Sequence, residues 1–444
     1  MKRLAFFLSI IVLANSGLLA ETLNLEQARM LALANSRSLA RYGLAIRSSI
    51  LDERNHLYSM LPSFSAGYTV SMSYLNDWRF ENPIDNFNAG ATFSVTQIIF
   101  QGGRSFIQRA INSIATESIR KSALAEYFSV LDAVDNAYFA VLEAAATLNA
   151  EESALQTAVL SLSIAEIRHE YGMINPGDFL RALAEKESRE NSRNQARRNL
   201  SLTTARFMTL TGLSQMPALE NIDFSIYDDL IQRLAGISDE EADALYDEFL
   251  KIITAANPSL ARAALNTQRA EMNLSLVRRE HAPTISARVF STAFNYSPSG
   301  GFNNTAAGGV SITGSIPIDF WVTANRVERS RIALESAALD FAYVGSSLET
   351  ELQSALINAF AQAESVLSSR RSLQHTERHF EFVMERYRLL QSSVSDVSEA
   401  AFLLITSQNN LIRASYGFMQ SLSRLRSLGA LSDEQRLINI LMGN

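Results

Sequence analysis

The chain has 444 residues, no cysteine and a formal net charge of -7 at pH 7. The acidic balance argues against nucleic acid as a partner, because phosphate backbones select basic surfaces. Without cysteine the chain has no disulfide framework, no thiolate metal site and no cysteine nucleophile.

Residues 1–20 are typical of a secretory signal peptide. Lys2 and Arg3 precede an apolar core at 4–13, and Ala20 offers a cleavage site. A membrane-spanning helix is the alternative, but the apolar core is short for one. We therefore expect an exported mature chain.

The segment 21–213 is predicted to form one structural repeat. Helical periodicity covers 24–61 and ends at Pro62. Apolar and small polar residues then alternate over 63–76 and 87–100, which predicts two strands about as long as a tilted, bilayer-spanning strand. A soluble sandwich shows the same alternation, but small hydroxyls and glycine on the second face suit a narrow, wet lumen better than a packed core.

Residues 103–211 are predicted to form a long helical hairpin. Tyr127, Val134 and Val141 begin a seven-residue repeat that continues to Leu162, the spacing of a coiled-coil seam. At 1.5 Å per residue the first arm would be ~100 Å long, several times the thickness of a bilayer. The chain turns at 175–177 and returns.

The whole unit is then repeated. The tetrapeptide at 38–41 recurs at 259–262. In the heptad column, Val134, Val141 and Leu148 recur 218 residues later as Leu352, Ala359 and Val366. The second repeat spans 257–431, with a helix at 257–282, strands at 284–297 and 305–318, and a hairpin at 321–428. The third predicted strand changes phase near Phe290, which predicts a bulge. An acidic segment, 214–256, joins the repeats, and 432–444 is a C-terminal tail.

Two repeats supply four strands, which is too few for a transmembrane barrel. Open strand edges are not tolerated in lipid, so several chains must pool their strands. Three chains would give twelve strands, and the same closure would bring their helices together into a tube. The predicted fold is thus an internally duplicated α+β membrane protein.

The mature sequence resembles the TolC-type outer membrane efflux proteins along nearly its whole length. The resemblance is carried by LNLEQA at 23–28, ANS at 34–36, TQIIFQGGR at 96–104 and the two helix turns. The family's turn signature is tyrosine, glycine three residues on and aspartate nine residues on. Tyr387 and Asp396 match it with Leu390 at the glycine position, and Gly172 and Asp178 match it with His169 at the tyrosine position.

The resemblance implies a homotrimer whose twelve-stranded transmembrane β-barrel lies in the lipid of the outer membrane and continues into a long periplasmic α-helical barrel. It also implies a periplasmic adaptor protein and an inner-membrane transporter as partners. The expected function is a passive duct of a tripartite efflux or type I secretion system, gated at its periplasmic tip. A protein-secretion duct and a periplasmic coiled-coil scaffold without a pore remain the alternatives.

The resemblance further implies which residues form the gate. Tyr387 is expected to contact Asp178, while Asp396 and Glu399 narrow the constriction. Ser392 stands where relatives often carry a basic residue, so no ion pair is expected from that position. Three-fold symmetry would make each acid a ring of three, which attracts cations.

A purely structural role for the same acids is an open alternative. Asp178 and Asp396 follow tight turns and would serve as N-caps, with Glu399 completing a capping box. His375 and His379 lie one helical turn apart, but no third ligand is visible, so no metal site is predicted. No catalytic constellation stands out, and neither an enzyme nor a cofactor is expected.

Overall fold

The computed structural model describes residues 22–73, 86–297, 301–303, 307–318 and 320–443. The predicted signal peptide and its cleavage site lie outside the described residues. Within the described part of the chain, each helix is too short or too polar to cross a membrane.

Helices make up most of the described chain. They are α2 Leu25–Asn35, α3 Arg37–Tyr58, α4 Arg104–Glu170, α5 Pro176–Thr211, α6 Asp228–Ala235, α7 Asp239–Ala256, α8 Pro258–Arg278, α9 Phe320–Arg388, α10 Val394–Leu428 and α11 Glu434–Met442, with 3-10 helices at Phe224–Tyr227 and Arg279–His281. The hairpin α4–α5 falls in the first repeat and α9–α10 in the second. The C-terminal segment 432–444, for which no element was predicted, holds α11.

The chain divides into two compact units. One comprises Met1–Ala40, Ala123–Pro258 and Gly345–Asn444, and the other comprises Arg41–Ser122 and Ser259–Val344. Each unit therefore contains segments of both sequence repeats. The compact units therefore do not coincide with the repeats predicted from the sequence.

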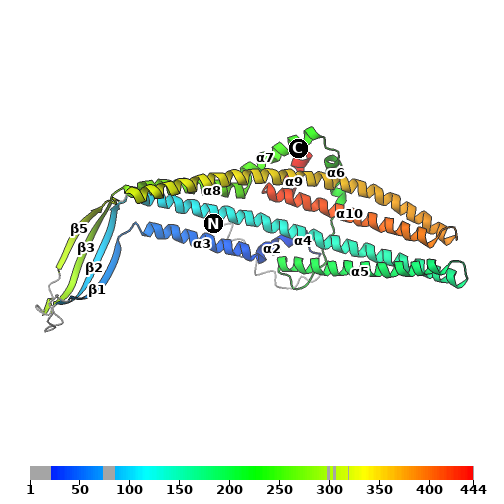
Figure 1. Ribbon diagram of the computed structural model, residues 1–444, viewed down its shortest axis with the longest axis horizontal. Coiled ribbons are helices and arrows are strands. Elements are labelled where there is room, and N and C mark those ends of the chain that lie inside the picture. Colours follow the sequence, from blue (N-terminus) through cyan, green and yellow to red (C-terminus); the bar gives the residue numbers. More distant parts are fainter. Residues whose placement is uncertain (1–21, 74–85, 298–300, 304–306, 319, 444) are drawn as a thin grey trace. The chain divides into compact units, whose positions relative to one another are not determined.

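The second unit contains one antiparallel sheet. Its strands are β1 Ser63–Ser73, β2 Asn86–Phe100, β3 Thr284–Ser297, β4 Gly301–Asn303 and β5 Ala307–Ser315. The order is β1-β2-β3, with β5 and the short β4 both on the far edge of β3 (Figure 1). The strand pairs of the two repeats thus join through β2 and β3.

The two faces of this sheet differ in polarity. Phe64 pairs with Val95, and Val289 pairs with Val310, so these side chains share one face. Phe64 is 80% exposed and Val310 73% exposed. On the opposite face, the hydroxyls of Ser65 and Ser94 lie 2.8 Å apart across β1 and β2. One face is therefore apolar and uncovered, and the other bears small polar groups.

The bulge predicted in the third strand is present. Ala91 pairs with Phe294 while Thr92 pairs with Thr292, which leaves Ala293 as the extra residue of β3. A second irregularity lies between Ile98 and Phe100 of β2. Such insertions change the facing of the residues beyond them and increase the local twist.

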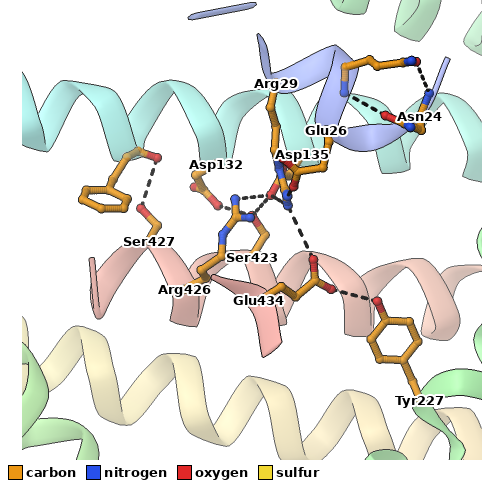
Figure 2. A network of polar contacts seen from close by, with 12 residues as sticks. Asn24, Glu26, Arg29, Asp132, Asp135, Tyr227, Ser423, Arg426, Ser427 and Glu434 are labelled. Atoms are coloured by element: carbon orange, nitrogen blue, oxygen red, sulfur yellow. Dashed lines mark hydrogen bonds and ion pairs between the residues drawn. The ribbon is translucent and has the colours of Figure 1, made fainter. Parts of the chain in front are cut away.

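The first unit is held together by a buried ionic network around Asp135 of α4 (Figure 2). Asp135 is fully buried. Arg29 of α2 binds it through two hydrogen bonds, Nε to Oδ1 at 2.7 Å and Nη2 to Oδ2 at 2.9 Å. Arg426 of α10 donates to the same carboxylate at 2.5 Å, and the Ser423 hydroxyl donates at 2.9 Å. One carboxylate therefore joins three helices.

Further carboxylates surround this pair of arginines. Glu26 forms an ion pair with Arg29, and Glu434 of α11 lies 3.8 Å from it. Glu434 also accepts a hydrogen bond of 2.8 Å from the Tyr227 hydroxyl (Figure 2). Burial alone would lower the pKa of Arg29, but the hydrogen bond and charge of Asp135 more than offset it, so the pKa is raised. The C-terminal helix α11 is thereby tied to the N-terminal helix α2.

Candidate functional site at the two helix turns

The two helical hairpins meet in a small apolar cluster next to their turns. Its buried members are Ala165 of α4, Ala182 of α5, Val383, Met384 and Tyr387 of α9, and Val394, Val397 and Ala400 of α10. Alanine at the contact positions lets the helices approach closely, and the aromatic ring fills the space between them. All four long helices therefore contribute to one core around Tyr387.

Tyr387 is held within the described chain mainly by its ring and its backbone. The side chain is 0% exposed. The hydroxyl makes no well-formed hydrogen bond to the described residues, but Ser161 lies close enough to lower the pKa of the phenol. Burial raises the pKa of the phenol, the Arg168 cation opposes that rise, and the charge of Asp178 adds to it. No hydrogen bond joins the Tyr387 hydroxyl to the Asp178 carboxylate, although the charge of Asp178 acts on the phenol.

Asp178 is instead engaged at the start of its own helix. The backbone N–H of Asp178 donates to Asn175 Oδ1 at 2.9 Å, and the Asn175 amide donates to the Asp178 carboxylate at 2.8 Å. Asn175 is the N-cap of α5, with Pro176 as its first helical residue. The prediction that Asp178 is the N-cap is wrong by three residues, because the turn ends earlier than the sequence suggested.

Asp396 occupies the matching place in the second hairpin. Ser393 is the N-cap of α10, and Asp396 is its reciprocal partner in a capping box. The Asp396 carboxylate accepts hydrogen bonds from the Ser393 N–H at 2.9 Å and the Ser392 hydroxyl at 3.0 Å, and these bonds lower its pKa. The predicted box of Asp396 and Glu399 is therefore wrong by three residues: Ser393 is the N-cap, and Asp396 completes the box. Glu399 is exposed, and its carboxylate makes no hydrogen bond or ion pair with the described residues.

The two turns share one backbone conformation. Gly172 has φ 66° and donates to His169 O at 3.0 Å, while Leu390 has φ 63° and donates to Tyr387 O at 3.2 Å. Left-handed backbone favours glycine, since a side chain there meets the following carbonyl. Leu390 therefore keeps the turn at a conformational cost that Gly172 avoids.

The side chains at equivalent places in these turns have exchanged their roles. In the first turn His169 is exposed and stacks on Phe179 with ring centroids 5.1 Å apart, and Arg168 is buried. In the second turn Tyr387 is buried and Arg386 is exposed. The two turns thus share a backbone conformation, while each contributes a different residue to the shared core.

Sequence reasoning did not identify Arg168. Its guanidinium carbon lies 4.0 Å from the centroid of the Tyr387 ring, and its Nη2 donates to the Tyr387 carbonyl. The only available signal was an arginine one residue before the position at which the family signature has tyrosine. The described residues contain no cluster of three or more metal-ligating His, Cys, Asp or Glu side chains.

Comparison with known proteins agrees with this architecture. The family model described as outer membrane efflux protein matches residues 27–213 and 250–430. Outer membrane protein TolC of Salmonella enteritidis is 21% identical over 428 residues, covering 94% of this chain and 78% of that protein.

Two solved structures show the same fold. The CmeC outer membrane channel of Campylobacter jejuni has a TM-score of 0.76 at 16% identity, covering 93% of this chain and 88% of that one. The outer membrane protein VceC of Vibrio cholerae has a TM-score of 0.73 at 15% identity, covering 91% and 96%. With the family model matching both repeats, the chain belongs to the outer membrane efflux protein family and is an outer membrane protein.

Proposed function

We propose that three copies of this chain form a passive duct through the outer membrane that is gated at the helix turns. The observation that carries the proposal is the sheet. Its four main strands leave β1 paired only with β2, and β5 only with β3, among the residues described. An edge of unpaired N–H and C=O groups must be closed inside lipid, and twelve strands from three copies would close it.

The polarity of the two faces supports the same proposal. Large apolar side chains such as Phe64, Val310 and Ile312 are exposed on one face, where they suit contact with hydrocarbon. Serine hydroxyls on the other face suit a wet interior. Uncovered apolar surface of this kind is unfavourable in water and is expected at a lipid or protein interface.

The gate is proposed at the cluster around Tyr387. Tyr387 would join the two hairpins in the closed state, with Asp178 beside it. Asp396 and Glu399, both exposed at the start of α10, would form rings of carboxylates around a three-fold axis and favour cations. We further infer that a periplasmic adaptor protein and an inner-membrane transporter complete the export path, an inference supported by family membership alone.

The test is to measure the native mass and the single-channel conductance of the purified mature protein in lipid bilayers. We expect a mass of three chains and a cation-selective conductance. Glu399→Gln should reduce that selectivity, and Glu152→Gln, an exposed acid on α4, should leave it unchanged. A monomer that stays in the aqueous phase and conducts nothing would contradict the proposal.

A further inference from the structure

Arg168 makes an unusual contact for a buried cation. It is 6% exposed, and it comes from α4, whereas Tyr387, the residue it contacts, belongs to α9. The guanidinium lies against the face of the Tyr387 ring and donates to the backbone carbonyl of the same residue. Both contacts cross from the first hairpin to the second.

No carboxylate neutralises Arg168 within the described chain. Its Nε is buried without a hydrogen-bond partner, and its two assigned contacts are both made to Tyr387. A buried arginine is normally paired with an acid, because an unpaired charge is costly to remove from water. The aromatic face and the carbonyl are thus its main sources of stabilisation.

The position of the charge relative to the helices adds to this contact. Arg168 lies in the last turn of α4, and the carbonyl that it binds lies in the last turn of α9. The C-terminal end of a helix carries partial negative charge from its unpaired carbonyls. One cation therefore serves two helix ends, and these ends separate if the two hairpins separate.

The Tyr387 hydroxyl takes no part in this contact. It makes no well-formed hydrogen bond to the described residues, and the Asp178 carboxylate is bound by Asn175. We propose that Arg168, acting on the ring face and carbonyl of Tyr387, is the residue that clasps the two hairpins together at their turns. The proposal rests on the gated duct proposed above, in which Arg168 is a positioning residue for the closed state.

The clasp is tested in channels with Arg168→Met, which removes the cation and keeps an apolar chain of similar length. We expect the ratio of open to closed channels to rise about tenfold, the effect of losing one desolvated cation–π contact with its hydrogen bond. Arg168→Lys should recover part of the loss, because it restores the charge without the planar group. Arg388→Met, an exposed cation in the same turn of α9 as Tyr387, is the matched control and should leave the ratio unchanged.

Tyr387→Phe separates the clasp from a latch based on the hydroxyl. It keeps both the ring and the carbonyl, so the ratio of open to closed channels should stay within about twofold of that of the unmodified protein. The clasp would be overturned by an Arg168→Met channel that gates like the unmodified one. It would also be overturned if Arg388→Met or Tyr387→Phe opened the channel equally.

A second readout does not depend on conductance. The chain has no cysteine, so Val397→Cys, at a position 1% exposed within the cluster, provides a single thiol. In that background Arg168→Met should speed maleimide labelling about tenfold, and Arg388→Met should not. If the unmodified protein shows neither a trimer nor conductance, the duct fails while accelerated labelling still supports the clasp. Equal labelling rates in both variants would refute the clasp whatever the conductance.

Discussion

Arg29 and Arg168 are both buried in the first unit, yet they are satisfied in opposite ways. Arg29 binds Asp135 through two nitrogens and has Glu26 and Glu434 beside it. Arg168 meets an aromatic ring and a carbonyl. Separating two buried, oppositely charged side chains is costly, because each would be left as an unpaired charge in an apolar interior. A ring and a carbonyl carry no net charge, so they are left neutral when the arginine withdraws. The first arrangement suits a permanent joint and the second a joint that opens.

The largest effect is expected at the permanent joint. Asp135→Ala leaves Arg29 and Arg426 buried near each other without their shared carboxylate, and we expect a loss of about 3–5 kcal/mol in the free energy of unfolding. Chemical denaturation of the purified protein measures it. Asp132→Ala, which removes a less buried acid from the same face of α4, should cost clearly less. A loss below about 1 kcal/mol for Asp135→Ala would break the comparison, since it would mean that the network contributes as little as a surface pair.

A medium effect is expected in the turns that carry Arg168 and Tyr387. Gly172→Ala places a side chain in left-handed backbone and should cost about 1 kcal/mol, while Leu390→Gly should stabilise by up to about 1 kcal/mol. Leu390 is 62% exposed, so its loss removes little packing. Thermal unfolding of the two variants checks the opposite signs. Destabilisation by both would show that the Leu390 side chain contributes contacts that outweigh its backbone strain.

The smallest effect is expected at Asp396, and it depends on pH. Its pKa in the folded protein is lowered by the Ser393 and Ser392 hydrogen bonds, so its stabilisation is present above the unfolded value of 3.8 and is lost as pH falls through the folded value. Asp396→Asn should therefore lower stability by only a few tenths of a kcal/mol at pH 7, because the carboxylate is solvated. Melting temperatures of the two proteins should converge as the pH falls below 3.8 and through the folded value. A difference that persisted there would point to a contact other than the charge.

The features that could be predicted from the sequence are those that depend on a periodic pattern of residues. The alternation in the strands, the phase change that marks the bulge at Ala293 and the seven-residue columns all depend on near neighbours along the chain. The acids at the turns were also recognisable, although their N-caps lie three residues earlier, at Asn175 and Ser393. Cap assignment depends on where the turn ends, and periodicity locates that only to within a few residues.

Contacts between residues far apart in the chain could not be predicted from the sequence. Asp135 looks like any acid on a solvated helix face, and its partners Arg29 and Arg426 are 106 and 291 residues away. Arg168 is separated from Tyr387 by 219 residues. Charge patterns along one helix say nothing about which helix covers them, so buried polar pairs became visible only in three dimensions.

The pairing of β2 with β3 has a consequence for assembly. Each repeat brings one strand pair, and the bond between the pairs is made within a single molecule. Covalent linkage turns that association into an intramolecular one, with an effective concentration far above that of free chains in solution. Any closed ring built from these pairs then requires half as many molecules as one built from unlinked repeats, and fewer encounters between them. Carrying both strand pairs in one chain thereby shortens the time that open strand edges remain available for aggregation.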